Sequence, residues 1–135
     1  MNLIALPMNA LKSDEFKSRS SHIGVRGEAI AAHYLESIGC RILARNFRRY
    51  KGEVDIICEE GSFLVAVEVK SRSGLLHGDP ETAIDQQQIE GISQAAGFFQ
   101  ELRGIQKELR FDIITIHFPK GKKARLKHFR DAFHG

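Results

Sequence analysis

The strongest constraint on the fold is a pair of β-rich segments in the middle of the chain. Residues 53–58 and 63–71 are rich in valine and isoleucine, and Glu59-Glu60-Gly61-Ser62 separates them. Two such runs joined by a short segment with a glycine predict a β-hairpin. The second run is apolar on both faces until Glu68 interrupts it, which is typical of a central strand covered on both sides.

Three charged residues of this hairpin, Asp55, Glu68 and Lys70, are predicted to share one face. Side chains alternate along a strand, so Glu68 and Lys70 point to the same side. A two-residue turn at Glu60-Gly61 would pair Asp55 with Ala66. Glu68 would then be the diagonal neighbour of Asp55, with about 7–8 Å between their α-carbons. A one-residue slip would put the two carboxylates on opposite faces.

Two carboxylates at this separation can converge on one divalent cation. Hard cations such as Mg²⁺ take oxygen ligands, lower the pKa of a bound water and neutralise charge on a phosphoryl group. Lys70 can orient that water or stabilise the transition state, and Glu28, at the edge of a predicted helix face, can add a third carboxylate. The alternative is a solvated polar face or a structural ion pair. Burying two carboxylates with one lysine is costly unless a cation or full ion pairing compensates their charge. The pattern alone leaves both interpretations open.

The rest of the chain predicts an α/β sandwich with a mixed sheet. Apolar residues at three- and four-residue steps predict two helices, and further β-rich runs predict more strands. We expect a flexible extension over residues 1–21 and one domain over residues 22–135. The predicted helices cover residues 23–38, ended by Gly39, and 82–102, after a looser segment at 74–80; the other predicted strands cover 42–46, 111–118 and, at an edge, 124–127.

Charge and composition add weaker constraints. The formal net charge is +3, which alone is weak evidence for nucleic-acid binding. Basic residues crowd into residues 41–51 and 120–130, where a solvated face and a phosphate-binding surface are alternatives. Cys40 and Cys58 lack metal-type spacing, so we interpret them as small buried thiols. No apolar run approaches the roughly 20 residues of a membrane helix, and no basic region of a signal peptide opens the chain, so we expect a cytoplasmic protein.

The arrangement of Asp55 followed by Glu68-Val69-Lys70 resembles the PD-(D/E)XK nuclease motif. A wider set of ordered blocks, over about residues 22–134, is similar to the YraN-like family of uncharacterised proteins. The blocks are GxxGE at 24–28, AxxYLxxxG at 31–39, Asn46-Phe47-Arg48, GEVDII at 52–57, VEVKxR at 67–72 and RFDII at 110–114, with Asp131-Ala132-Phe133 near the end.

This resemblance implies a restriction-endonuclease-like fold, with a mixed sheet flanked by helices, similar to archaeal Holliday junction resolvases. It implies catalytic roles for Asp55, Glu68, Lys70 and Glu28, and Mg²⁺ or Mn²⁺ held by Asp55, Glu68 and Glu28. Two positions depart from the superfamily pattern. Val54-Asp55 replaces the common Pro-Asp pair, and Gln88 stands in the second helix where relatives usually have a lysine. Many superfamily nucleases carry a glutamine at a comparable place, but a fold does not establish an activity.

The resulting hypothesis is a metal-dependent nuclease-like protein that binds DNA and hydrolyses its phosphodiesters, with branched or structured DNA as a candidate substrate. We expect a homodimer if it cuts two strands or recognises a junction. One alternative is a non-catalytic nucleic-acid-binding module with the same fold, and another is a protein–protein adaptor with structural ion pairs. The expected nucleic-acid contacts are Arg45, Arg48, Arg49, Arg72 and Gln88.

Overall fold

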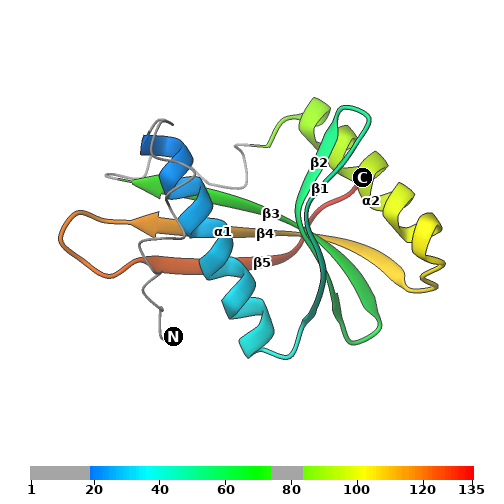
Figure 1. Cartoon of the computed structure of the whole chain (residues 1–135), viewed down its shortest axis with the longest axis horizontal. Coiled ribbons are helices and arrows are strands. Elements are labelled where there is room, and N and C mark those ends of the chain that lie inside the picture. The colour runs from blue at the N-terminus through cyan, green and yellow to red at the C-terminus, as the bar shows by residue number, and fades with distance from the viewer. Residues whose placement is uncertain (1–18, 74–83) are drawn as a thin grey trace.

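The computed structural model describes residues 19–73 and 84–135, which form a five-stranded sheet with two flanking helices (Figure 1). Residues 1–18 of the predicted extension and the predicted looser segment at 74–80 lie outside the described residues, whereas residues 19–21 belong to the first helix. The elements are α1 (Arg19–Ser37), β1 (Arg41–Arg49), β2 (Gly52–Glu60), β3 (Phe63–Ser73), α2 (Gln86–Arg103), β4 (Glu108–Phe118) and β5 (Arg125–Phe133).

The sheet is mixed, as the sequence predicts. Its strands lie in the order β1-β2-β3-β4-β5. Within the described strands, β3 and β4 pair in parallel and the other neighbours are antiparallel. Parallel neighbours need a crossover connection, and α2 lies in the connection between β3 and β4.

Each face of the sheet has its own apolar core. Leu35 of α1 packs on the face that carries Val67, whereas Phe99 of α2 packs on the face that carries Ala66. Ala66 and Val67 are consecutive in β3, so their side chains point to opposite faces. Each fully buried Leu, Val or Phe stabilises the fold by about 1.5–3 kcal/mol relative to an exposed one. Neither of the two described helices is long and apolar enough to cross a membrane.

The helices end where glycine allows a left-handed turn. Gly39 follows α1 with a φ of 93°, and Gly104 follows α2 with a φ of 61°. Ile38, which the helical pattern assigned to the buried face, is 39% exposed because it follows the last helical residue. The second helix begins at Gln86 rather than at the predicted residue 82. Asp85 caps it in an extended conformation, and its side chain accepts a hydrogen bond from the backbone of Gln88 (2.8 Å).

The β2–β3 hairpin forms, but its turn lies one residue later than predicted. Ile57, rather than Asp55, pairs with Ala66, so the loop is Gly61-Ser62 and not Glu60-Gly61. Gly61 has a φ of 58° and takes the first loop position, where a positive φ favours glycine. The predicted pairing was therefore wrong by two residues. An even shift leaves every side chain on its predicted face.

Both edge strands extend beyond their predicted ends. β1 reaches Arg49 and β5 reaches Phe133. Each contains a residue with a left-handed backbone, Asn46 in β1 and Asp131 in β5, both with a φ of 53°. Asparagine and aspartate tolerate this conformation better than most residues. The exposed, polar character of these strands weakens their sequence signal.

Candidate functional site

Asp55 lies where β2 and β3 separate. The regular pairing of the two strands ends at Ile56 and Val67. Beyond that point the backbone N–H of Val69 donates a hydrogen bond to Asp55 Oδ2 (2.8 Å). A carboxylate thus takes over as the partner of β3 at the fork between the strands, which fixes the Asp55 side chain in place.

Glu68 lies beside Asp55 at this fork. Continuing the strand register one step past its last pair puts the two residues next to each other, and their carboxyl groups interact directly. Lys70 shares the face of Glu68, with its Nζ 3.5 Å from Glu68 Oε2. The side-chain amide of Gln88, in the first turn of α2, donates to the same oxygen. The structure therefore brings together Asp55, Glu68, Lys70 and Gln88, and Glu68 is only 6% exposed.

Glu28 reaches the same region from α1, and Asn46 connects it to the sheet. With its amide nitrogen turned toward the carboxylates, Asn46 donates to Glu28 Oε1 (2.9 Å) and to Glu53 Oε1 (3.3 Å). The sequence analysis marks Asn46 as part of a family motif, but it does not predict that Asn46 lies at the site. The signal was a polar residue inside a β-rich run, but its partners lie on other elements, Glu28 on α1 and Glu53 on β2.

The carboxyl groups at the fork are short of compensating positive charge. Burial and the negative charge of Asp55 raise the pKa of Glu28 to about 7, against a smaller lowering effect of Arg45. Burial, together with the hydrogen bond and charge of Asp55, holds the pKa of Glu68 well above its usual range, and Lys70 offsets only part of this shift. A cation placed among these groups would lower both pKa values, because it favours the charged carboxylates.

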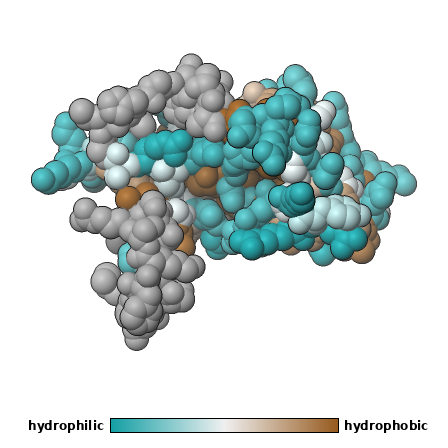
Figure 2. Space-filling view, turned by 90° about the horizontal axis from the view of Figure 1, so that it is seen from above, coloured by the Kyte–Doolittle hydropathy of each residue, from teal (hydrophilic) through white to brown (hydrophobic). Residues whose placement is uncertain are grey.

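These side chains line a cavity of about 580 Å³ between the fork and the start of α2. On the face seen from the top of Figure 1, hydrophilic residues cover most of the described surface and hydrophobic ones show in the recess at its middle (Figure 2). The volume lies in the usual range of ligand sites, about 300–1,000 Å³. Besides Glu28, Asp55, Glu68 and Gln88, the lining includes Lys51, Glu53 and Asp85. Its charged residues are mostly acidic, so the cavity suits a cation.

Two glycines let β2 approach α2 closely at the edge of this cavity. A Cβ on Gly52 would collide with the carbonyl oxygen of Gly91, and a Cβ on Gly91 would lie 3.1 Å from the Cα of Gly52. The position of Gly52 therefore requires glycine. Gly91 is one helical turn beyond Gln88, so this backbone contact holds the start of α2 against the strand that carries Asp55.

Two of the predicted phosphate-binding arginines lie near the carboxyl groups. Arg45 is exposed on β1 and acts electrostatically on Glu28. Arg48 is also exposed, and its Nε lies 3.4 Å from Glu53 Oε2. Gln88, predicted as a nucleic-acid contact, is instead engaged with the carboxylate of Glu68. Its observed partner is thus inside the site.

None of the four predicted arginines is in the lining of the cavity, and the other two have their contacts elsewhere. The guanidinium of Arg49 lies over the rings of Tyr50 and Phe98, 4.6 and 4.1 Å from their centroids. Arg72 is exposed near the end of β3 and donates to the backbone carbonyl of Ser71 (3.1 Å). Both keep their charge at the surface, where a phosphate can reach it.

The donor set at the fork consists of oxygen atoms, which suits a hard cation. Within residues 19–73 and 84–135, no group of three or more histidine, cysteine, aspartate or glutamate residues is arranged to hold a metal ion. What the structure does bring together is the pair Asp55 and Glu68. Mg²⁺ is commonly held by one or two carboxylates, with water or substrate oxygens completing its shell. The residues present therefore fit a cation of this type.

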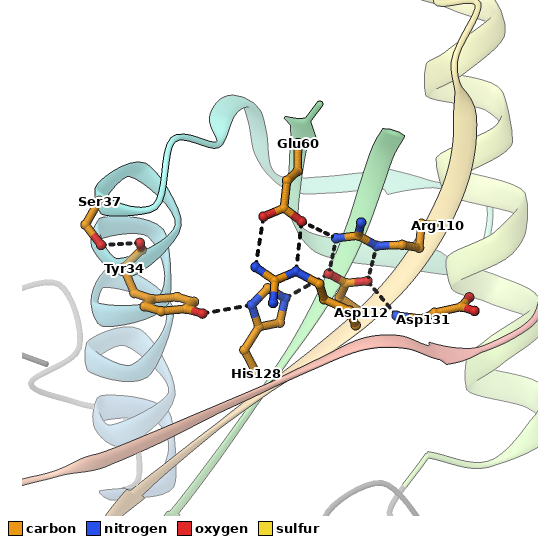
Figure 3. Close-up of polar contacts among 8 residues, drawn as sticks. Tyr34, Ser37, Glu60, Arg110, Asp112, His128 and Asp131 are labelled. Atoms are coloured by element: carbon orange, nitrogen blue, oxygen red, sulfur yellow. Dashed lines mark hydrogen bonds and ion pairs between the residues drawn. The ribbon is translucent and has the colours of Figure 1, made fainter. Parts of the chain in front are cut away.

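A second charged cluster, which the sequence pattern does not predict, lies on the α1 face of the sheet. Asp112 of β4 is completely buried, and it accepts two hydrogen bonds from Arg110 (2.8 and 2.7 Å), one from His128 (2.8 Å) and one from the backbone of Asp131 (3.0 Å) (Figure 3). Burial alone would raise the pKa of Asp112. The hydrogen bonds from His128, Arg110 and the Asp131 backbone outweigh it, and the pKa is lowered.

Glu60 extends this cluster and balances its charge. It accepts hydrogen bonds from Arg110 (2.7 Å) and from both ends of the Arg130 guanidinium (2.9 Å each). The contact with Arg130 is the main reason that the pKa of Glu60 falls to about 2. On the far side, the Tyr34 hydroxyl lies 2.9 Å from Nδ1 of His128. Two arginines thus face two carboxylates, as in a structural network.

The signal for this network was present but ambiguous. Arg110 and Asp112 alternate on one face of an otherwise apolar strand, which indicates a buried ion pair. Their partners on β2 and β5 are distant in sequence, and β5 was predicted only as far as residue 127. The residues of β5 that complete the network, His128, Arg130 and Asp131, lie beyond that predicted end.

Comparison with known proteins assigns the chain to a family. The profile described as "Uncharacterised protein family UPF0102" matches residues 27–116. A UPF0102 protein of Rhodococcus opacus is 40% identical over 114 residues, which cover 82% of this chain and 95% of the relative. Relatives of the same description are 41% identical over 112 residues in Geobacter sulfurreducens (82% and 88% covered) and 39% identical over 114 residues in Bacteroides thetaiotaomicron (84% and 93% covered). The chain therefore belongs to the uncharacterised family UPF0102, the YraN-like family that its motifs resemble.

Proposed function

We propose that this protein is a metal-dependent nuclease that binds DNA and hydrolyses phosphodiester bonds at the cavity beside the β2–β3 fork. The observation that carries the proposal is the direct contact of Asp55 and Glu68 in the lining of a polar cavity, with the Lys70 ammonium 3.5 Å from Glu68. Two adjacent buried carboxyl groups cost stability unless a ligand compensates them. Perturbed carboxyl groups in a cleft are typical of functional sites.

The same observations support a restriction-endonuclease-like assignment for the fold. The mixed sheet has one helix against each face, and the acidic residue and the Glu-x-Lys segment occupy the two strands of one hairpin. In this assignment, Asp55 and Glu68 hold Mg²⁺ or Mn²⁺, with Glu28 close by as a further carboxylate. When bound, the cation supplies charge neutralisation and a water of lowered pKa.

The residues of the chain itself position the reactants. The Lys70 ammonium, 3.5 Å from Glu68, is placed to donate to a phosphate oxygen or to the attacking water. Gln88 holds the Glu68 carboxyl in one orientation. Arg45 and Arg48, whose charges act near Glu28 and Glu53, can hold flanking phosphates. The water oxygen bonds to phosphorus and releases one proton to solvent, the bond from phosphorus to the leaving oxygen breaks, and that oxygen takes up a proton from solvent.

The test is cleavage of labelled DNA by the pure protein. Duplex, single-stranded, flap and four-way junction DNA are each incubated with Mg²⁺, Mn²⁺ or chelator. We expect metal-dependent cleavage of at least one substrate. Lys70→Ala should lower the rate about 10²–10³-fold, because its contact exists mainly in the transition state. Its affinity for DNA, measured in Ca²⁺, should stay close to that of the wild type.

A matched control is Lys107→Ala. Lys107 pairs with Glu59 of β2 (2.9 Å), at the other end of the hairpin from Lys70. That variant should cut at the wild-type rate. Equal rates for Lys70→Ala and wild type would remove Lys70 from the mechanism. If no DNA is cut but binding persists, the protein is a non-catalytic nucleic-acid-binding module instead.

A further inference from the structure

We propose that Tyr50, in the turn between β1 and β2, is a stacking platform for an unpaired nucleobase next to the cavity. The preferred ligand is then DNA with single-stranded nucleotides beside the bound phosphate. The proposal rests on the proposed function for the nature of the ligand, and it adds which class of DNA the site prefers.

Tyr50 is displayed at the surface in an unusual way. Its side chain is 74% exposed, more than the other exposed large hydrophobic residues of the described chain, Leu102 (64%) and Ile38 (39%). Its backbone has a φ of 57°, a positive value that the first position of the two-residue turn between Arg49 and Gly52 requires. The turn therefore accounts for this backbone, and the exposed ring is the feature to be explained.

The ring of Tyr50 is supported from one side. The guanidinium of Arg49 lies 4.6 Å from the centroid of the Tyr50 ring and 4.1 Å from that of Phe98, so it fills the corner between the two rings. Phe98 is in turn stacked on Phe47 of β1, with 6.4 Å between centroids and 20° between planes. This layered support holds the ring while most of its surface remains in contact with solvent.

The platform adjoins the candidate site directly. Lys51 and Gly52, the next two residues, both line the cavity. Gly91 touches Gly52, and Phe98 lies two helical turns further along the same face of α2. One rigid unit therefore carries the exposed ring and one wall of the cavity, so a base stacked on Tyr50 belongs to a nucleotide near the phosphate in the cavity.

The chemistry of this surface selects unpaired nucleotides. Proteins that bind single strands combine aromatic platforms with nearby positive charge that follows the backbone. Tyr50 supplies the platform, and Arg48, Arg49 and Lys51 supply the charge. A base inside a duplex has both faces covered by its neighbours, so it cannot stack on a side chain unless it leaves the helix.

The test measures the affinity of the full chain in Ca²⁺ for three DNAs of equal length, a single strand, a blunt duplex and a duplex with a single-stranded overhang. We expect tighter binding of the two DNAs with unpaired bases. Tyr50→Ala should weaken these by about 5- to 150-fold and leave the blunt duplex almost unchanged. Tyr50→Phe should bind like the wild type. Ile38→Ala, which removes another exposed apolar side chain, should change none of the three affinities.

Intrinsic fluorescence gives an independent readout. The chain has two tyrosines and no tryptophan, so the emission comes from Tyr50 and Tyr34, and the Tyr50→Phe variant gives the signal of Tyr34 as a reference. Saturating single-stranded DNA should quench the emission of the wild type but not that of Tyr50→Phe.

Several results would overturn the proposal: no preference for unpaired bases in the wild type, equal losses on all three DNAs in Tyr50→Ala, or no quenching. Absence of DNA binding would also overturn it, and Tyr50 would then be a candidate protein contact. A Tyr50-dependent preference without cleavage would support the platform while removing hydrolysis from the proposed function. Cleavage with no effect of Tyr50→Ala would do the reverse.

Discussion

Glu60 and Glu68 lie on consecutive strands of one hairpin, yet their surroundings move their pKa values in opposite directions. Arg130 and Arg110 lower the pKa of Glu60 to about 2. Burial and Asp55 raise the pKa of Glu68, and Lys70 offsets only part of that effect. Both carboxyl groups are part of charged clusters, but one cluster is complete in itself and the other is not.

The difference separates a structural role from a functional one. In the network around Asp112, every carboxylate oxygen has a donor and the charges balance, so nothing further needs to bind. At the fork, two carboxyl groups face one lysine, and the cavity leaves room for a ligand. Burial alone is thus a poor guide to function. What indicates a functional site is a shortage of positive charge around buried carboxyl groups.

The largest effect should come from breaking the complete cluster. Asp112→Ala removes the buried carboxylate that both Arg110 and His128 contact and leaves Glu60 as the remaining carboxylate partner of Arg110. The free energy of unfolding should therefore fall by about 3–5 kcal/mol. Glu68→Gln, measured in chelator, should leave it unchanged or raise it, because the neutral amide avoids the cost of charging a buried carboxyl group beside Asp55. Urea denaturation measures both.

If Asp112→Ala fails to fold, Arg130→Gln tests the same network more mildly. Arg130 is half exposed, and its loss should cost about 0.2–1 kcal/mol. A similar loss of stability in Glu68→Gln and Asp112→Ala would erase the proposed contrast between the two clusters.

The next largest effect should be stabilisation of the incomplete cluster by metal. A ligand that binds only the folded state adds about 2.7 kcal/mol at 100 times its dissociation constant. Mg²⁺ or Mn²⁺ should therefore raise the melting temperature of the wild type, and Glu68→Gln should lose most of the shift. Glu59→Gln, an acidic residue of the same hairpin outside the cavity lining, is the control. An equal shift in wild type and Glu68→Gln would argue against a metal at Glu68.

Smaller effects of opposite sign should follow changes in pH without metal. The pKa of Glu28 is raised from 4.5 to about 7, so its contribution to stability is complete below pH 4.5 and is lost as the pH rises through 7. The pKa of Glu60 is lowered from 4.5 to about 2, so its contribution is present above pH 4.5 and is lost as the pH falls toward 2. After solvent screening, each amounts to about 1–2 kcal/mol.

Melting temperatures across the pH range check these signs. Glu28→Gln should flatten the loss between pH 4.5 and 7, and Glu60→Gln should flatten the loss on the acid side. If either substitution flattened the wrong side, the charge assignment of that cluster would be incorrect.

The smallest effect should separate the arginines of the two regions. Replacing Arg45 and Arg48 together by glutamine should flatten the salt dependence of duplex binding by about 0.9 per lost phosphate contact. Arg130→Gln should not change that slope, because Arg130 is engaged with Glu60 (2.9 Å). Equal slopes in all proteins would mean that the arginines of β1 do not contact phosphate.

The sequence was sufficient to bring Asp55, Glu68 and Lys70 together, because alternation along β3 puts Glu68 and Lys70 on one face and the hairpin brings Asp55 beside them. The register error of two residues did not matter for the face, but it changed the relation of Asp55 to Glu68 from diagonal to adjacent. Which residue of Glu60-Gly61-Ser62 opens the turn depends on backbone energetics that composition does not determine.

Contacts between side chains of different helices and strands could not be predicted from the sequence. Predicting the hydrogen bond from Gln88 to Glu68 requires the position of α2, and predicting the one from Asn46 to Glu28 requires the path of β1. The network around Asp112 needs the full length of β5. These depend on packing between elements that periodicity cannot express, whereas the family motifs alone had already marked most of the residues involved.

The contact between Gly52 and Gly91 has a consequence for how this site can change in evolution. Because main chain touches main chain there, the aperture between β2 and α2 is set without any side-chain rotamer. Substitutions among the lining residues can alter the charge and chemistry of the opening while its span stays constant. Replacing Gly52 would do the opposite, since any larger residue must push the helix outward. The dimensions of the opening and its chemical selectivity can therefore evolve independently.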